Sequence, residues 1–230
     1  MVKLSQSLVE GRFIRRLNRF AALVEVSGQE EMVHVANSGR LGELLVPGYR
    51  MLLNPVAGEH RKCSYDLALV DLGFALTSAD ARLPNPLFAE AVEQGRLSQF
   101  LGYSKIRREV VFGESRLDLL LEGPGPSCYV ETKSVTLVEE GIARFPDAPT
   151  TRGVKHLNHL ARAVEEGHRA AVVFVIQRHD ARCLQPHDTA DPEFGETLRR
   201  VVESGVEALA YRCRVTLEEI TLSDRIPIEL

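Results

Sequence analysis

Apolar and polar residues alternate in short stretches through the first third of the chain. Turn-forming pairs such as Ser27-Gly28, Pro47-Gly48 and Asn54-Pro55 separate these stretches, which lie at 9–17, 22–26, 31–35, 42–46, 51–53 and 65–72. A period of two residues is typical of strands with one buried face. Five or six short strands without an intervening helix predict a small barrel, and an OB-fold is a common barrel of this size.

The pattern changes after residue 82, where helices and strands begin to alternate. Apolar residues at helical spacing predict helices over 86–95, 151–167 and 191–204, and apolar runs predict strands over 106–112, 170–177 and 206–215. Asn85 is expected to cap the first of these helices, with Pro86 at its first position. Alternation of this kind is typical of an α/β domain with a mixed sheet. We therefore expect two domains, an OB-like barrel over 1–82 and a mixed sheet flanked by helices over 83–230.

The segment between the predicted strands 106–112 and 170–177 carries charges on an otherwise apolar hairpin. Its two strands flank the breaker-rich turn 123–126, and pairing about that turn places Asp118 opposite Glu131. Lys133 points to the same face as Glu131, because side chains of a strand alternate. Two facing carboxylates repel each other unless a cation lies between them. A divalent cation such as Mg²⁺ or Mn²⁺, which binds one or two protein carboxylates, is the expected cofactor.

Composition narrows the class of protein. An apolar fraction of 44% and a charged fraction of 26% are typical of a soluble globular chain. The longest apolar run, 170–176, is too short to span a bilayer, and the first residues have no signal-peptide pattern. We therefore expect a cytoplasmic protein without a membrane partner. The four cysteines are widely spaced, which argues against a zinc ribbon or a disulfide framework.

The net charge of −4 offers no argument for nucleic-acid binding. The distribution of charge does, because basic residues cluster in the predicted barrel. The candidates on the predicted barrel are basic and aromatic residues, which in OB-folds can line a groove for single strands: Arg12, Phe13, Arg15, Arg16 and Tyr65. A purely structural barrel is the alternative. Arg152 and Lys155 begin a predicted helix, where backbone N–H groups favour a phosphate.

Two histidine patterns suggest other chemistry. His156 and His159 lie on one face of the predicted helix, but no third ligand is evident, so zinc is disfavoured. His179-Asp180 lacks the further His and Asp residues on helices that a phosphohydrolase site needs, and it is more consistent with a loop.

The charged hairpin also resembles a known active-site pattern and a known family. An Asp followed by Glu-x-Lys on the next strand resembles the core of the PD-(D/E)xK nucleases. The chain as a whole resembles the sugar fermentation stimulation protein family of bacteria and archaea. The motifs that carry this resemblance are Pro-Asn-Pro at 84–86, Arg-Leu-Asp-Leu-Leu-Leu at 116–121, Tyr-Val-Glu-Thr-Lys-Ser-Val-Thr-Leu at 129–137 and Phe-Pro-Asp-Ala-Pro-Thr-Thr-Arg-Gly-Val-Lys-His-Leu at 145–157.

The resemblance implies an OB-like domain followed by a restriction-endonuclease-like domain, and a protein that binds DNA. It also implies that Asp118 and Glu131 are metal-binding carboxylates, Lys133 the motif lysine, and Glu90 a helix glutamate that joins the metal site. The family is described as regulating sugar metabolism. The sequence leaves open whether the protein forms a homodimer.

Two functions are consistent with these expectations. The first is a metal-dependent nuclease of low sequence specificity. The second is a non-catalytic DNA-binding regulator of sugar (maltose) metabolism, in which the nuclease fold serves only as a platform. Two repelling carboxylates on a partly buried surface would bring no benefit to a platform, so the set Asp118, Glu131 and Lys133 favours chemistry.

Overall fold

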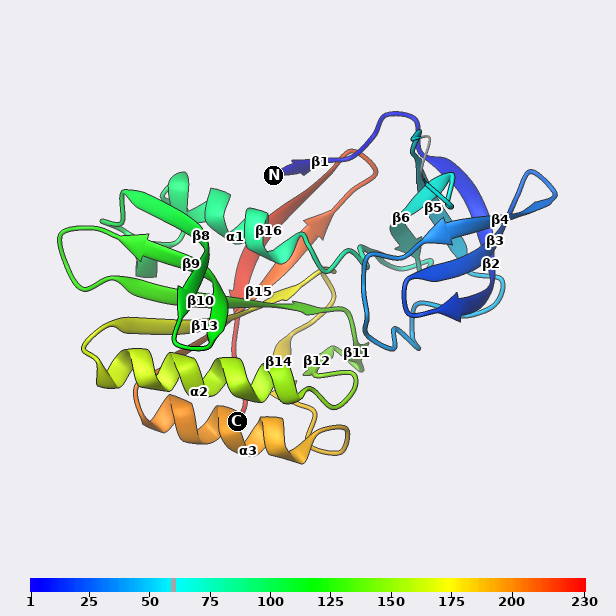
Figure 1. Ribbon diagram of the computed structural model, residues 1–230. Helices are drawn as coiled ribbons and strands as arrows, with labels where there is room; N and C mark the ends of the chain where they lie inside the picture. The colour runs from blue at the N-terminus through cyan, green and yellow to red at the C-terminus, as the bar shows by residue number, and fades with distance from the viewer. Residues whose placement is uncertain (59–60) are drawn as a thin grey trace.

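Five strands in the N-terminal part close into a barrel, as expected. The structure is a computed structural model that describes residues 1–58 and 61–230 (Figure 1). The strand order is β4-β3-β2-β5-β6-β7, and a parallel pairing of β4 with β6 closes the barrel. The five barrel strands are β2 (Val9–Asn18), β3 (Ala21–Val26), β4 (Gln29–His34), β5 (Arg50–Pro55) and β6 (Tyr65–Asp71). The short strand β7 (Leu76–Thr77) pairs with the outer edge of β6.

Alternate side chains of these strands fill the barrel. Phe13 of β2 is buried among them, so the expectation that it lines a nucleic-acid groove is wrong. The strand expected at 42–46 is also absent from the described residues. This segment is a turn in which the backbone N–H groups of Leu44 and Leu45 donate to the carbonyl of Leu41. The apolar positions 41 and 44 are three residues apart, and a helical turn buries both of them in the barrel core.

The C-terminal part is a seven-stranded mixed sheet with helices on both faces. Its strand order is β1-β16-β15-β13-β10-β9-β8. Helix α1 (Pro84–Glu93) covers one face, and α2 (Thr151–Glu165) and α3 (Pro192–Glu203) lie side by side on the other (Figure 1). The strands are β1 (Val2–Lys3), β8 (Lys105–Phe112), β9 (Ser115–Glu122), β10 (Cys128–Val135), β13 (Arg169–Ile176), β15 (Glu207–Val215) and β16 (Glu219–Ile226).

Two parts of this domain were not expected from the sequence. The first strand of the chain, β1, pairs with β16 and so extends the C-terminal sheet before the barrel begins. The expected loop after Lys133 contains two short strands, β11 (Val138–Glu139) and β12 (Ile142–Phe145), which form a small second sheet with β14 (Cys183–Pro186) from beyond β13. Strands this short carry too few alternating positions to be recognised.

Helix α1 begins earlier than expected. Leu83 stands at the N-cap position and Pro84 opens the helix, so Asn85 lies inside the first turn instead of capping it. Proline is tolerated there because the first turn needs no backbone donor. The other two helices begin with side-chain caps, in which Thr150 accepts from the N–H of Gly153 and Asp191 from that of Phe194.

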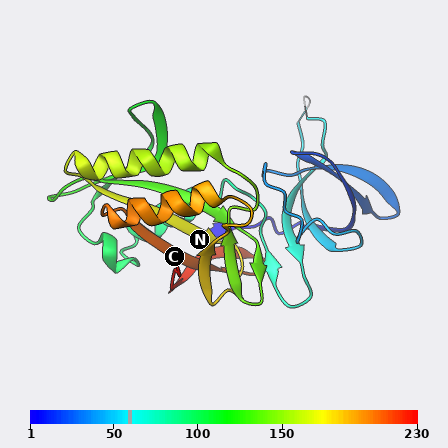
Figure 2. The same ribbon diagram turned by 90° about the horizontal axis from the view of Figure 1, so that it is seen from below.

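Figure 2 shows the barrel beside the C-terminal domain. Leu52 and Leu69 of the barrel belong to the same buried cluster as Phe88 of α1, and polar contacts add to this packing. The hydroxyl of Thr136 donates to Glu43 Oε1 at 2.8 Å, and the N–H of Leu41 donates to Asp147 Oδ2 at 3.1 Å. These contacts hold the barrel turn 41–46 against the segment that follows β10. In the part of the chain that the structure describes, no helix is both long and apolar enough to cross a membrane.

Candidate active site between the two domains

The hairpin of β9 and β10 has the expected register. Leu121 pairs with Cys128 and Leu119 with Val130, so the next facing pair in this register is Asp118 and Glu131. The regular ladder stops before that pair. Asp118 Oδ2 instead accepts hydrogen bonds from the backbone N–H and the hydroxyl of Thr132, both at 2.7 Å. Thr132 thereby fixes the Asp118 carboxylate beside Glu131.

The Asp118 carboxylate is held in an environment that disfavours its charge. Burial raises its pKa above the ordinary value, and the negative charge of Glu131 raises it further, while the two hydrogen bonds from Thr132 act in the opposite direction. A nearby cation would relieve this unfavourable pairing.

Glu131 is a buried carboxylate that is bonded to two other side chains. It is only 4% exposed, and its Oε1 accepts a hydrogen bond from Lys133 Nζ at 2.7 Å and is also bonded to His156 Nδ1. Burial alone would raise the pKa of this carboxyl, but the positive charge of Lys133 and the interaction with His156 outweigh burial and lower it. The second oxygen, Oε2, is buried and has no hydrogen-bond partner among the described residues.

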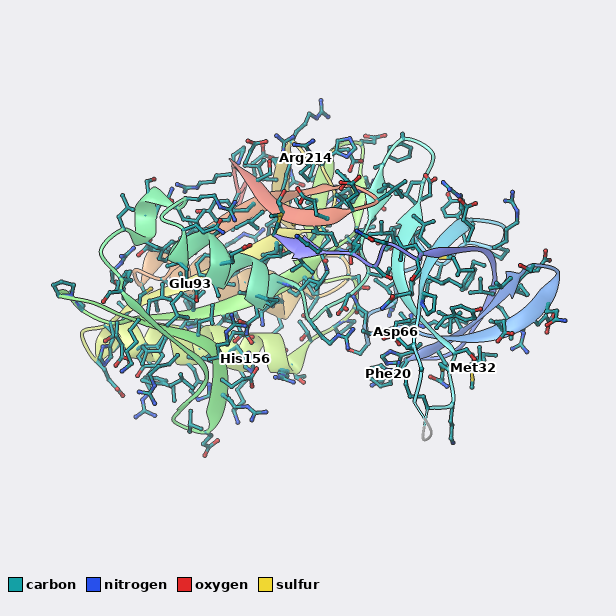
Figure 3. The ribbon with its side chains drawn as sticks, turned by 90° about the horizontal axis from the view of Figure 1, so that it is seen from above. Phe20, Met32, Asp66, Glu93, His156 and Arg214 are labelled. Carbon is teal, nitrogen blue, oxygen red and sulfur yellow. The ribbon has the colours of Figure 1, made fainter. Side chains whose placement is uncertain are left out.

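His156 was considered from the sequence only as a zinc ligand with His159, and its contact with Glu131 was not expected. It lies in the second turn of α2, within the C-terminal domain (Figure 3), and its Nε2 faces Arg152 Nε at 3.4 Å. The contact with Glu131 depends on how α2 packs against β10. Within the described residues, no three or more His, Cys, Asp or Glu side chains gather into a metal-binding group.

The candidate residues line a cleft of about 980 Å³ between the two domains. Asp118, Glu131 and Lys133 lie along one part of it. Its lining also includes arginines from the barrel and from the C-terminal domain, namely Arg16, Arg19, Arg40, Arg82, Arg144 and Arg152. The cleft is therefore lined with positive charge contributed by segments that are far apart in the sequence.

These arginines differ in how their donors are used. Arg82 pairs with Asp80, and Arg144 with Glu139. Arg16 donates to the backbone carbonyls of residues 18, 19, 37, 39 and 40, so it holds the turn 37–40 against β2. Arg19, Arg40 and Arg152 have no carboxylate partner within residues 1–58 and 61–230. They are the cations in the cleft best able to bind a phosphate.

The other residues expected to contact nucleic acid lie outside the lining of this cleft. Arg12 donates to the carbonyl of Gly48, Arg15 is exposed on β2, and Tyr65 packs against the barrel core. Lys155 pairs with Glu114 at 3.3 Å on the surface of α2. Among the predicted contact residues, only Arg16 and Arg152 line the cleft with the carboxylates.

The structure does not bring Glu90 to the site, which corrects the expectation that it binds the metal. Its carboxylate pairs with the N-terminal amino group of Met1 and lies 3.9 Å from Arg96 Nη2. Glu90 follows Asn85 by five residues, so the two side chains point in different directions from α1. It is Asn85 that lines the cleft, and its Oδ1 is buried without a partner among the described residues.

The oxygen atoms of the cleft fit a hard divalent cation. Asp118 and Glu131 supply two carboxylates, and the free oxygens of Glu131 and Asn85 are buried acceptors that lack donors in the described structure. Mg²⁺ usually takes one or two protein carboxylates and completes its octahedron with water and phosphate oxygens. The site therefore needs no cluster of three acidic residues to hold such an ion.

Comparison with known proteins agrees with the two-domain architecture. Residues 14–76 match the family described as the SfsA N-terminal OB domain, and residues 82–219 match the sugar fermentation stimulation protein RE domain. The sugar fermentation stimulation protein homolog of Desulforamulus reducens is 44% identical over 223 residues, which are 97% of this chain and 93% of the relative. That of Caldanaerobacter subterraneus subsp. tengcongensis is 45% identical, with 97% of both chains covered.

A solved structure agrees over the full length. The structure of Pyrococcus furiosus SfsA in complex with Ca²⁺ superimposes with a TM-score of 0.91, at 32% identity and with 100% of both chains covered. Both domains and their arrangement are therefore shared with that protein. The chain belongs to the sugar fermentation stimulation protein family.

Proposed function

We propose that the protein is a divalent-metal-dependent phosphodiesterase that cuts DNA with little sequence specificity. The observation that carries this proposal is the buried Glu131 carboxylate, whose Oε2 has no partner in the described residues although Asp118 and Lys133 are next to it. Buried polar atoms are nearly always hydrogen-bonded, so an unpartnered one in a cleft suggests a ligand.

Asp118 and Glu131 would hold Mg²⁺ or Mn²⁺. Such an ion would polarise the scissile phosphate and lower the pKa of an attacking water. The Ca²⁺ in the structure of Pyrococcus furiosus SfsA supports a divalent cation in proteins of this kind. The resemblance of the hairpin to the PD-(D/E)xK nucleases supports the same pair of ligands.

The chain's own side chains would orient the reaction. Lys133, fixed by its bond to Glu131, would donate to a phosphate oxygen on which negative charge increases in the transition state. His156 would hold the Glu131 carboxylate in one orientation, and Thr132 would do the same for Asp118. Neither carboxylate would need to reorganise when the substrate binds.

The cations of the cleft would bind the DNA backbone. Arg19 and Arg40 come from the barrel and Arg152 comes from α2, so a phosphate chain passing between the domains would meet positive charge on both sides. Phosphate contacts position a strand without reading its sequence. Binding should therefore weaken steeply as the salt concentration rises.

Cleavage of labelled DNA tests the proposal. With Mg²⁺ or Mn²⁺ the wild type should cut DNA, and EDTA should abolish cutting. Lys133→Ala should cut about 10²–10³-fold more slowly, while its affinity for DNA in EDTA should fall far less, because the arginines of the cleft remain. The control Lys105→Ala changes an exposed lysine that pairs with Glu122 outside the cleft, and it should cut normally.

Folding has to be checked in the same experiment, because Lys133→Ala leaves Glu131 buried with one cation fewer. Circular dichroism should show a native spectrum at the assay temperature. Binding by the wild type without any metal-dependent cleavage would contradict the nuclease and favour a non-catalytic DNA-binding regulator.

A further inference from the structure

We propose that the cleft takes a single strand of DNA and that one unpaired base of this strand stacks on Phe20. This inference rests on the proposed function and specifies the form of its substrate. Phe20 lies in the turn between β2 and β3, directly after Asn18 and Arg19, which line the cleft. Figure 3 shows Phe20 on the side of the barrel toward the domain that carries His156.

The ring of Phe20 is exposed although its backbone is held firmly. The residue is 52% exposed. Its N–H donates to Asn18 Oδ1 at 2.8 Å, and its carbonyl accepts from the N–H of Val35 at 2.9 Å. Arg16 also donates to the carbonyl of Arg19 at 2.7 Å. The turn therefore holds the backbone of Phe20 in place while its ring faces solvent.

A cation accompanies this aromatic face. Arg19 precedes Phe20, lines the cleft and has no carboxylate partner among the described residues. Proteins that bind single strands combine cations that follow the phosphates with aromatic rings on which the bases stack. Arg19 and Phe20 supply one of each in adjacent positions.

The depth of the carboxylates favours a single strand over a duplex. Glu131 is 4% exposed and Lys133 9% exposed, and both line a cleft between two domains. In a duplex each strand is paired and stacked along its length, so its bases cannot turn away from the backbone without unpairing. A single strand can direct a phosphate inward and splay a base outward. Arg40 and Arg152 would hold the phosphates on either side.

Exposed aromatic residues elsewhere do not share this setting. Phe74 is 68% exposed in the turn between β6 and β7, and the Arg178 guanidinium lies 5.8 Å from its ring centroid. Neither phenylalanine lines the cleft itself, but Phe20 directly follows the lining residue Arg19, whereas the neighbours of Phe74 are not part of the lining. Phe74 is therefore the matched control for Phe20, since it is an exposed phenylalanine at a turn of the same barrel.

Equilibrium binding in EDTA, where no metal-dependent cutting consumes the probe, tests the inference. Fluorescence anisotropy would compare a labelled strand of about 16 nucleotides with its duplex and with the matching RNA strand. The wild type should bind the DNA strand at least about tenfold more tightly than the duplex. Phe20→Ala should weaken single-strand binding by about 5- to 150-fold, the range for loss of one stacked base, and Phe74→Ala should not.

A scan of single abasic positions separates stacking from a change in fold. One position of the strand should weaken binding when its base is removed, and this loss should disappear in Phe20→Ala but persist in Phe74→Ala. Phe20→Trp should retain binding, because its ring also stacks.

The possible results separate this inference from the nuclease proposal. Equal affinity for strand and duplex, or an unchanged affinity in Phe20→Ala, would overturn the single-strand inference, while metal-dependent cutting of duplex DNA would leave the nuclease intact. Tighter binding of the RNA strand would overturn the assignment of DNA. If the wild type neither binds nor cuts DNA in any form, both proposals are wrong.

Discussion

At the scale of single residues, the Glu131 carboxylate shows how the site tolerates a buried charge. Lys133 and His156 both bond to one of its oxygens, and this compensates the loss of hydration. The other oxygen is left without a protein donor in the described structure. The negative charge of the carboxylate is therefore compensated by its neighbours, while one of its oxygens stays free to accept a further ligand.

His156 should act by positioning Glu131. We expect His156→Ala to lower metal-dependent cleavage by about 10- to 100-fold and to raise the metal concentration needed for half-maximal rate, as loss of residues that orient metal ligands commonly does. Binding of DNA in EDTA should stay unchanged. Metal titrations of the cleavage rate provide the measurement. His159→Ala, one turn along α2, is the control, and an equal loss in both variants would indicate a general effect on the helix.

Asp118 should lower stability in the absence of metal. Burial and the charge of Glu131 both raise its pKa, so its ionised form is disfavoured. Asp118→Asn keeps an acceptor for Thr132 but removes the charge. In EDTA we expect this variant to be more stable by about 1 kcal/mol, or about 2–4 °C in Tm.

Thermal unfolding with and without metal completes this test. Mg²⁺ or Mn²⁺ should raise the Tm of the wild type, because a ligand that binds only the folded state stabilises it. Asp118→Asn should show little such increase and should not cut DNA. A metal-dependent rise of the same size in both proteins would contradict the assignment of Asp118 as a ligand.

At the scale of elements, Asp191 links the two helices on one face of the sheet. Its Oδ1 caps α3 by accepting from the N–H of Phe194 at 3.1 Å, and its Oδ2 accepts from the N–H of Thr150 at 2.7 Å. Thr150 in turn caps α2, which carries Arg152 and His156. One buried carboxylate thereby fixes the start of the helix that completes the candidate site.

Removing this link should be costly. Asp191→Ala leaves two backbone donors without their acceptor, and we expect a loss of about 2–3 kcal/mol in the free energy of unfolding. Asp191→Asn keeps an acceptor and should lose about 1 kcal/mol or less. Urea denaturation measures both. The hypothesis would be wrong if the two substitutions cost the same.

At the scale of the whole molecule, the cleft exists because a barrel turn is held against the other domain. Glu43 is part of that contact and accepts a hydrogen bond from Thr136. Burial raises its pKa, and the charge of Asp147 adds to this effect, while the hydrogen bonds to Glu43 and the charge of Arg178 oppose it. The domain contact is therefore destabilised when Glu43 is ionised.

The sign of the pH effect follows from this raised pKa. Stability linked to Glu43 is fully present below the unfolded-state pKa, and it is lost as the pH rises through the higher folded-state pKa. Glu43→Gln still accepts from Thr136 but cannot ionise. It should raise the Tm by about 2–4 °C at neutral pH, and the difference should disappear near about pH 4.

Thermal unfolding across this pH range checks the prediction. Glu30→Gln, on the exposed side of β4, is the control and should follow the wild type at every pH. A Glu43→Gln profile that runs parallel to the wild type would show that Glu43 does not affect the stability of the folded chain.

Local patterns determined several features without help from the fold. Alternation identified most of the barrel strands, because one buried face imposes a period of two on each strand. The turn 123–126 determined the register of β9 and β10, since a hairpin pairs residues equidistant from its turn. The neighbourhood of Asp118, Glu131 and Lys133 followed from this register. These features depend on residues that are close in the sequence.

Long-range packing decided the rest of the candidate site. His156 reaches Glu131 only because α2 packs against β10, and the packing of α1 turns Asn85 rather than Glu90 toward the cleft. The barrel arginines join the cleft only through the contact between the two domains. No local period encodes these distances, because they depend on how separately formed elements pack. The sequence alone therefore determined the two carboxylates and the lysine, whereas the tertiary structure decided what surrounds them.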